Sequence, residues 1–264
     1  MLKFLLLRPH HVKNSQGIQL PMIPLINLGA DVKCIFRERI NRFLGTVDID
    51  SPALENEKVH IHDPGRLEDL LYRNNEVLLK EARGKGRKTD WDIIAGYDAQ
   101  NKCWVPVHSG YHSRIAERIL ENEKTSPFGK IERIKSEVAH ERSRLDFLVT
   151  AGGEKIWVEV KGCTLARDGV SLFPDAPTKR GTKHLKSLMD AVGEGDMAAV
   201  MFLVFRRDAK CFSPNEEMDP EFAKTFREAM NAGVEIHAFR LIYEKGTVYF
   251  DEEIPICNFD GLPV

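Results

Sequence analysis

Two carboxylates and a lysine stand on two short segments of strand-forming residues in the middle of the chain. Asp146 lies in segment 144–149, and Glu159 and Lys161 lie in segment 156–161, which gives the spacing Asp-x12-Glu-x-Lys. Alternate residues of a strand share a face, so Glu159 and Lys161 project to the same side. A glycine-containing turn between the segments would fold them into a hairpin and bring Asp146 near Glu159.

These three side chains suit a site for a hard divalent cation. Carboxylates bind Mg2+ or Mn2+, and a lysine beside them can orient water or stabilise charge on a phosphate. Glu-x-Lys in a strand is commonly only a solvated face. This strand is otherwise apolar, however, and a carboxylate there is costly unless it is paired or metal-bound. We therefore predict a metal-dependent phosphodiesterase site in which Asp146 and Glu159 bind the metal and Lys161 is catalytic.

Other titratable residues are weaker candidates for catalytic or metal-ligating roles. Glu137 precedes the hairpin and is predicted to add a catalytic carboxylate, although an exposed position in a charged stretch is the alternative. The pairs His60 with His62 and His108 with His112 could each ligate a metal. Neither pair has an obvious third ligand nearby, so we predict that these histidines are structural.

The densest run of positive charge is the segment 83–88, which Trp91 follows. Glycines between the basic side chains would let the backbone approach a phosphate chain, and Trp91 could stack on a base. The alternative is a solvated hairpin tip with Trp91 in the core. We predict nucleic-acid contacts from Arg83, Lys85, Arg87, Lys88 and Trp91.

A second basic cluster leads into a helix that is predicted to start at Lys183. The first amides of a helix favour anions, so cations there oppose the helix dipole unless an anion is bound. The alternative is a mobile charged loop. We predict phosphate contacts from Lys179, Arg180, Lys183 and His184.

Composition describes a globular chain in which nucleic-acid binding must come from local charge. Hydrophobic residues are 42% and charged residues 30% of the 264 residues, and the net charge of −2 gives no general attraction to phosphate. The five cysteines are odd in number and scattered, without a Cys-x-x-Cys pair. They argue against a disulfide scaffold or a zinc finger and favour a reducing cytoplasm. The N-terminal apolar run is too short for a signal peptide or a membrane span, so we expect a cytoplasmic protein without a membrane partner.

Short strands separated by turns occupy the first half of the chain and predict a small β-barrel or sandwich. One helix is predicted at 63–71, where Asp63 could cap it and Leu67, Leu70 and Leu71 form its apolar side. The strands are expected at 32–38, 42–48, 58–62, 76–81, 91–97 and 103–107.

The pattern changes near Gly110, after which helices alternate with strands. The order α-β-β-β-α-β-α-β predicts a three-layer α/β sandwich around a mixed sheet. Helices are expected at 114–122 with Ser113 as the cap, at 183–192 and at 220–231, and strands at 131–138, 145–150, 156–161, 198–205 and 234–241. The predicted units are an N-terminal extension (1–28), a barrel (29–109) and an α/β domain (110–264).

Several motifs occur in one order along residues 30–240. They include Arg39-Ile-Asn-Arg42-Phe43, His62-Asp-Pro-Gly-Arg66-Leu67, Ser143-Arg144-Leu-Asp146-Phe147, Val158-Glu-Val-Lys-Gly162, Phe173-Pro-Asp-Ala176 and Arg180-Gly-Thr-Lys-His-Leu185. Together they resemble the sugar fermentation stimulation protein family. The chain departs from that family at His112-Ser113, where an asparagine is usual, and in its longer leader.

The resemblance implies an OB-fold-like barrel followed by a PD-(D/E)XK nuclease-like domain. It implies that the nuclease motif falls on Asp146, Glu159 and Lys161, with Glu137 as the extra acid. It also implies DNA binding and a link to the regulation of sugar metabolism. Within the matching motifs we predict further nucleic-acid contacts from Arg42, Arg66 and Arg144.

Two hypotheses follow for the function. The first is a DNA-binding protein with a nuclease site that uses Mg2+ or Mn2+. The second is a non-catalytic DNA-binding regulator of sugar metabolism genes that retains the nuclease fold. Intact Asp146, Glu159 and Lys161 favour the enzyme, because a pure binder does not need paired buried acids. Single-stranded DNA, RNA and a homodimer stay open as alternatives.

Overall fold

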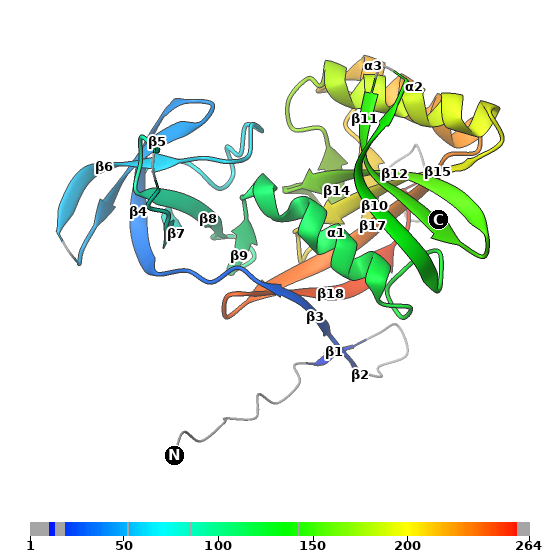
Figure 1. Ribbon diagram of the computed structural model, residues 1–264. Helices are drawn as coiled ribbons and strands as arrows, with labels where there is room; N and C mark the ends of the chain where they lie inside the picture. Colours follow the sequence, from blue (N-terminus) through cyan, green and yellow to red (C-terminus); the bar gives the residue numbers. More distant parts are fainter. Residues whose placement is uncertain (1–10, 14–18, 52, 85, 142, 258–264) are drawn as a thin grey trace.

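The chain folds into a small β-domain followed by a larger domain in which helices cover a twisted sheet (Figure 1). The short segment between them runs directly into the first long helix. No helix within the described residues is long and apolar enough to cross a membrane. The computed structural model describes residues 11–13, 19–51, 53–84, 86–141 and 143–257.

The first domain is a closed five-stranded barrel, as the run of short strands predicted. The strands lie in the order β6-β5-β4-β7-β8, and parallel pairing of β6 with β8 closes the ring. Closure satisfies both edges of the sheet, and Phe36, Val47 and Ile93 are among the side chains that fill the core. The strands are β4 (Val32–Asn41), β5 (Leu44–Ile49), β6 (Leu54–His60), β7 (Glu76–Glu81), β8 (Trp91–Asp98) and β9 (Cys103–Pro106), which extends the sheet beyond β8.

The helix predicted at 63–71 does not form. Leu67 has a φ of 54°, which interrupts a right-handed helical path. Distant side chains bind the backbone of this segment instead: Arg39 donates to the Gly65 carbonyl at 2.7 Å, and Asp175 accepts from the Leu67 amide at 3.3 Å. The three leucines of the segment are buried, as their pattern indicated. Tertiary partners therefore replace the hydrogen bonds of a helix.

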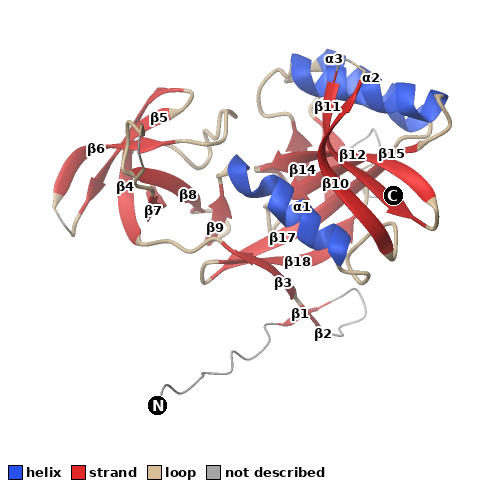
Figure 2. Ribbon diagram, in the orientation of Figure 1, coloured by secondary structure: helices blue, strands red, loops and turns tan. Residues whose placement is uncertain are grey.

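The second domain is a three-layer sandwich around a seven-stranded mixed sheet, as predicted. The sheet order is β10-β11-β12-β15-β17-β18-β3, with β12, β15 and β17 parallel to one another. Figure 2 shows one helix, α1, on one face and the pair α2 and α3 on the other. The elements are α1 (His112–Glu121), β10 (Ile131–His140), β11 (Ser143–Ala151), β12 (Glu154–Cys163), α2 (Lys179–Gly193), β15 (Met197–Val204), α3 (Pro220–Asn231), β17 (Glu235–Glu244), β18 (Thr247–Ile254) and β3 (Ile23–Asn27).

Local sequence explains most of these elements. β15 is apolar and buried along nearly its whole length because helices cover both faces of the sheet. α1 buries Ile115 and Ile119, which lie one turn apart on one face of the helix. α3 begins at Pro220 after Asp219, whose side chain accepts from the Phe222 amide at 3.0 Å.

Several elements were not predicted. β3 comes from within the predicted N-terminal extension and pairs with β18, which follows the last expected strand. Ser113 does not cap α1, which begins one residue earlier with Tyr111 at the cap position. The short elements are β1 (His11–Lys13), β2 (Gln19–Pro21), η1 (Ser109–Tyr111), β13 (Leu165–Arg167), β14 (Val170–Phe173) and β16 (Cys211–Pro214). Such strands contain too few residues to show an alternating pattern.

The sequence argument against disulfides does not hold for one pair of cysteines. Cys211 and Cys257 form a disulfide across 46 positions of the chain. A bridge between Phe212 and Ile256 brings them together, which no spacing rule could show. The free cysteines among the described residues are Cys34, Cys103 and Cys163.

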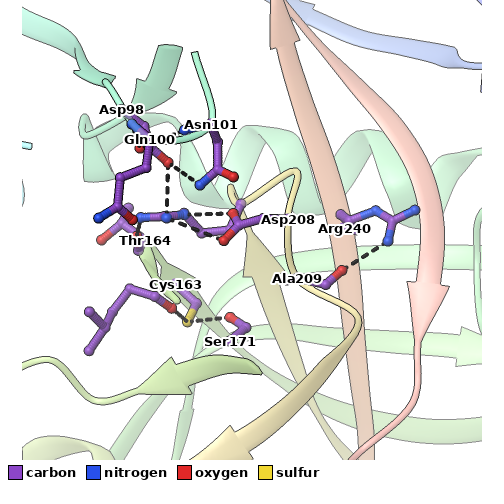
Figure 3. A network of polar contacts seen from close by, with 11 residues as sticks. Asp98, Gln100, Asn101, Cys163, Thr164, Ser171, Asp208, Ala209 and Arg240 are labelled. Carbon is purple, nitrogen blue, oxygen red and sulfur yellow. Dashed lines mark hydrogen bonds and ion pairs between the residues drawn. The ribbon is translucent and has the colours of Figure 1, made fainter. Parts of the chain in front are cut away.

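A buried ion pair joins the two domains. Arg206, which follows β15, lies 2.9 Å from Asp98 at the end of β8, and their side chains are 4% and 6% exposed. Arg206 also donates to Asp208 at 3.0 Å and to the Thr164 carbonyl at 3.3 Å. Figure 3 shows Asp98, Thr164 and Asp208 converging on this guanidinium group. Loss of Arg206 would leave the buried Asp98 carboxylate without its counterion, so this pair contributes to holding the barrel against the sheet.

Candidate functional site

The predicted hairpin aligns three acids across neighbouring strands. The β10–β11 register places Glu137 opposite Asp146, because the residues on both sides of them are paired. The β11–β12 register places Glu159 opposite Asp146, since the adjacent residues Phe147 and Val158 are paired. Opposed residues of antiparallel strands share a face. We refer to Glu137, Asp146 and Glu159 as the acid row.

Glu159 is the most deeply buried member of the acid row, with 3% of its side chain exposed. Its Oε1 atom contacts both Lys161 Nζ and His184 Nδ1. Its Oε2 atom is buried and has no hydrogen-bond partner among the described residues. Burial alone would raise the pKa of Glu159, but the charge of Lys161 and the hydrogen bond from His184 outweigh it and lower that pKa. The result is an ionised carboxylate with one unsatisfied oxygen.

Asp146 is oriented by the main chain. The amide of Val160 donates to Asp146 Oδ2 at 2.7 Å. Burial and the charge of Glu159 nevertheless raise the pKa of Asp146 to about 6. Two mutually repelling, largely buried carboxylates form an arrangement that a divalent cation would stabilise.

His184, which was predicted to contact phosphate, lies within this cluster beside Glu159. It projects from α2, is buried, and contacts Glu159 through Nδ1. Its Nε2 atom is 3.3 Å from Arg180 Nε, and Lys161 Nζ is 3.5 Å from its Nδ1. The predicted phosphate contact of His184 stays a prediction, and the contact that the structure shows is with Glu159.

α2 begins at Lys179, four residues before its predicted start. Thr178 caps the helix, with its side chain accepting from the Gly181 amide at 3.0 Å. As a consequence the exposed Lys179, Arg180 and Lys183 stand in the first turns of a helix and not in a loop. The first turn contains no acidic residue, so its amides and side chains together favour an anion.

A cleft lined by both domains lies beside the C-terminal end of β12. The barrel contributes Arg42, and the second domain contributes Gly162, Lys179 and Arg180. Arg66 lines an adjacent pocket. Basic residues that were predicted from separate parts of the sequence thus come together around one opening.

Glu137 and Arg144 lie at the exposed rim of the acid row. The Glu137 side chain is 53% exposed and lies 2.8 Å from Arg144 Nε. Glu137 has a φ of 57°, which is uncommon for a residue other than glycine. The catalytic role of Glu137 and the DNA contact of Arg144 stay predictions, and the ion pair links the two residues.

The basic segment of the barrel is partly engaged within the protein. Arg87 pairs with the carboxylate of Asp92, and Arg83 pairs with an acid at the end of β7. The residues predicted to contact nucleic acid therefore differ in their exposure to solvent. Arg83 and Lys88 are exposed, whereas Trp91 is partly buried against the core. Lys85 lies outside the described residues.

His112 connects α1 to β12, the strand that carries Glu159 and Lys161. Its ring stacks on Phe205 with centroids 5.5 Å apart. A Cβ atom added at Gly162 would lie 2.0 Å from the His112 ring, so only glycine permits this contact directly after Lys161. Burial lowers the pKa of His112 to about 4, which keeps the ring neutral at pH 7.

A second polar cluster, which was not predicted, lies in the barrel beside the domain junction. The rings of His62 and His108 stack with centroids 3.6 Å apart. Asp92 Oδ2 lies 3.2 Å from His62 Nε2 and 3.8 Å from His108 Nε2. The sequence analysis paired His62 with His60 and His108 with His112 and found no third ligand. The structure instead joins His62 to His108 through Asp92, and we call these three residues the histidine cluster.

Family models match both domains of the chain. The SfsA N-terminal OB domain matches residues 38–107, and the sugar fermentation stimulation protein RE domain matches residues 110–247. Two proteins described as sugar fermentation stimulation protein homologs illustrate the similarity. The one from Methanothermobacter thermautotrophicus is 45% identical over 80% of this chain and 88% of its own. The one from Thermosipho melanesiensis is 41% identical over 91% of this chain and 100% of its own.

A solved structure has the same architecture. The structure of Pyrococcus furiosus SfsA in complex with Ca2+ matches with a TM-score of 0.81 and 28% sequence identity, covering 89% of this chain and 99% of that chain. The likeness extends over the OB-like barrel and the α/β domain.

Proposed function

We propose that this chain is a metal-dependent phosphodiesterase that binds and cleaves DNA. The chain belongs to the sugar fermentation stimulation protein family. One observation carries the proposal: the buried Glu159 Oε2 has no hydrogen-bond partner among the described residues, while Lys161 holds the other oxygen of the same carboxylate. An unsatisfied buried polar atom costs roughly 1–3 kcal/mol. A metal ion bound to this oxygen would remove that cost.

The acid row fits a hard divalent cation. Asp146 and Glu159 offer carboxylate oxygens only, which suit Mg2+, Mn2+ and Ca2+. A cation between them would relieve the repulsion that helps to raise the pKa of Asp146. The relative from Pyrococcus furiosus was solved in complex with Ca2+, another oxygen-binding cation, and this supports a cation site in the present chain.

The residues of the chain have distinct tasks in this proposal. The Val160 amide orients Asp146, and His184 orients Glu159. A bound Mg2+ or Mn2+ would act as a Lewis acid towards a phosphate oxygen. Lys161, with 16% of its side chain exposed, would stabilise negative charge that develops on the phosphate or hold a water molecule in place.

The cleft between the domains supplies a path for the nucleic-acid backbone. Arg42, Lys179 and Arg180 surround it, and the N-terminus of α2 points its amides toward the same side as these cations. Arg83 and Lys88 would extend the contact along the barrel. Phosphate contacts of this kind position a nucleic acid without reading its sequence, so we expect binding with little base preference.

Incubation of end-labelled single- and double-stranded DNA and RNA with the full chain and Mg2+, Mn2+ or EDTA tests the proposal. We expect cleavage of DNA with either metal, none with EDTA, and a loss of about 10²-fold or more in Glu159→Gln. Glu154→Gln, an exposed change on the same strand, is the matched control and should retain activity. DNA binding without cleavage under any metal would reject the phosphodiesterase and favour the non-catalytic regulator.

A further inference from the structure

We propose that His62, Asp92 and His108 form a second metal site, which takes a transition-metal ion such as Zn2+ at the junction between the barrel and α1. One ligand atom from each residue lies within 4.8 Å of the other two. Ligands of a tetrahedral Zn2+ ion are about 3.3 Å apart at the usual bond lengths of about 2.0–2.1 Å. The existing separations of 3.2 and 3.8 Å from Asp92 Oδ2 are already close to that spacing.

Unsatisfied ring nitrogens point to a ligand at this cluster. His62 Nε2, the atom 3.2 Å from Asp92 Oδ2, is buried and makes no hydrogen bond among the described residues. His108 presents its Nε2 atom to the same oxygen at 3.8 Å, too far for a hydrogen bond. The His108 side chain is 10% exposed, so water does not readily replace such a partner. Buried structural histidines are normally hydrogen-bonded. A neutral imidazole presents one nitrogen with a lone pair, and this is the atom that a metal binds.

The ligand types distinguish this site from the acid row. Two imidazoles and one carboxylate suit Zn2+, whereas carboxylates alone suit Mg2+ or Mn2+. Arg87 contacts Oδ1 of Asp92 and leaves Oδ2 facing the histidines. A hydrogen bond to the second oxygen is the usual way in which a metal-binding carboxylate is oriented. His62, with 25% of its side chain exposed, leaves a route from solvent and a fourth position for water.

The three residues come from different parts of the barrel, so a bound ion would tie these parts together. His62 follows β6, Asp92 lies on β8, and His108 immediately precedes η1 and α1. Ser109 Oγ already donates to the His62 carbonyl at 2.7 Å. An ion here would strengthen the exit from the barrel into the second domain, and it would stabilise the folded chain by mass action.

Titration of metal-free full chain with Co2+ and Zn2+ tests the site without any activity measurement. We expect Co2+ to give the visible absorption of a tetrahedral complex, and Zn2+ to displace it. In His62→Asn and in His108→Asn the absorption should be lost, and Zn2+ affinity should fall at least about 100-fold, because loss of outer partners alone costs 10–100-fold. Zn2+ should also raise the Tm of the wild type and not of these variants.

Two control variants test whether the Co2+ ion is bound at the histidine cluster. Asp146→Asn should keep the Co2+ absorption, since it removes a ligand of the acid row only. His237→Asn, which alters a histidine held between two glutamates on another strand, should also keep it. Circular dichroism of each metal-free variant confirms that it folds. An absence of tetrahedral Co2+ absorption in the wild type, or its persistence in both folded histidine-cluster variants, would overturn the assignment.

Discussion

The acid row and the histidine cluster contain similar numbers of titratable residues, yet they differ in charge and in assembly. The acid row places three carboxylates on the adjacent strands β10, β11 and β12, beside Lys161. The histidine cluster combines two imidazoles with one carboxylate, from segments that meet only when the barrel closes. The first arrangement suits a hard cation beside a phosphate, and the second suits a borderline metal that joins segments of the fold.

The aspartates of the two clusters show how much the partners of a buried acid matter. Burial and the charge of Glu159 raise the pKa of Asp146 to about 6. Burial also disfavours ionised Asp92, but His108, His62 and Arg87 outweigh it and lower its pKa. Burial raises the pKa of both acids, and the neighbouring groups decide whether the raised pKa persists, as in Asp146, or is reversed, as in Asp92.

The largest expected effect separates chemistry from metal binding in the acid row. Lys161→Met should lower the single-turnover rate of DNA cleavage by about 10²–10³-fold, because it removes a charge beside the reacting phosphate. Calorimetric affinity for Mn2+ should change little, since both carboxylates remain. Lys155→Met, at an exposed position of the same strand, is the control. Equal losses in the two variants would remove Lys161 from the mechanism.

Metal affinity should then distinguish the two clusters. Asp146→Asn should weaken Mn2+ binding by at least about 10–100-fold while leaving Co2+ binding at the histidine cluster intact. In the wild type, Mn2+ affinity should also fall by up to about tenfold per pH unit below a pKa of about 6, because protons then compete for Asp146. Calorimetry at pH 7.5 and 5.0 measures both effects. Unchanged Mn2+ binding in Asp146→Asn would place the cation elsewhere.

In the absence of metal, replacing Asp146 or Asp92 by asparagine should change the free energy of unfolding in opposite directions. The pKa of Asp146 is raised from 3.8 to about 6, so the stability gained from its protonation is present below pH 3.8 and lost as the pH rises through about 6. Asp146→Asn should therefore raise the free energy of unfolding at pH 7.5 by about 1–3 kcal/mol, and by less at pH 4.5. Asp92→Asn should lower it at pH 7.5. Urea unfolding of both variants in the presence of EDTA measures these changes. A change in the same direction in both variants would contradict the prediction.

The smallest effect concerns the exposed cations of the barrel. Replacing Arg83 and Lys88 together by alanine should weaken DNA binding without sequence bias and reduce the slope of log affinity against log salt by about one unit per lost contact. Mn2+ binding should be unchanged because the acid row lies in the other domain. Lys186 and Lys224, exposed on the outer helices, provide the matched control pair. If the salt dependence of DNA affinity were identical to that of the wild type, the segment with Arg83 and Lys88 would be only a solvated turn.

Much of the fold could be predicted because its signals are local. Alternation and turn residues located the barrel strands, and Asp219 followed by Pro220 marked the start of α3. The alignment of Asp146 with Glu159 was also predictable, because one short hairpin sets the register of both strands. α3 has the predicted bounds and α1 lies close to its predicted place, because each helix carries an apolar stripe by itself.

Features that depend on distant partners could not be predicted. The helix expected at 63–71 does not form because Arg39 donates to a carbonyl of this segment and Asp175 accepts from one of its amides. Neither residue is near the segment in sequence. The start of α2 at Lys179 depends on Thr178, whose amide is held by Asp219. That earlier start also places His184 in the second turn of α2, where it is buried and contacts Glu159 of the acid row.

The sequence by itself determined the strands of the barrel, the α/β order of the second domain and the close approach of Asp146 and Glu159. Each of these follows from side-chain periodicity within a strand, a helix or one hairpin. Only the tertiary structure decided that His62 meets Asp92 and His108, that Cys211 meets Cys257, and that β3 joins the far edge of the sheet. These contacts depend on barrel closure and sheet order, and residues far apart in a chain carry no local signal of the partner that the fold will bring to them.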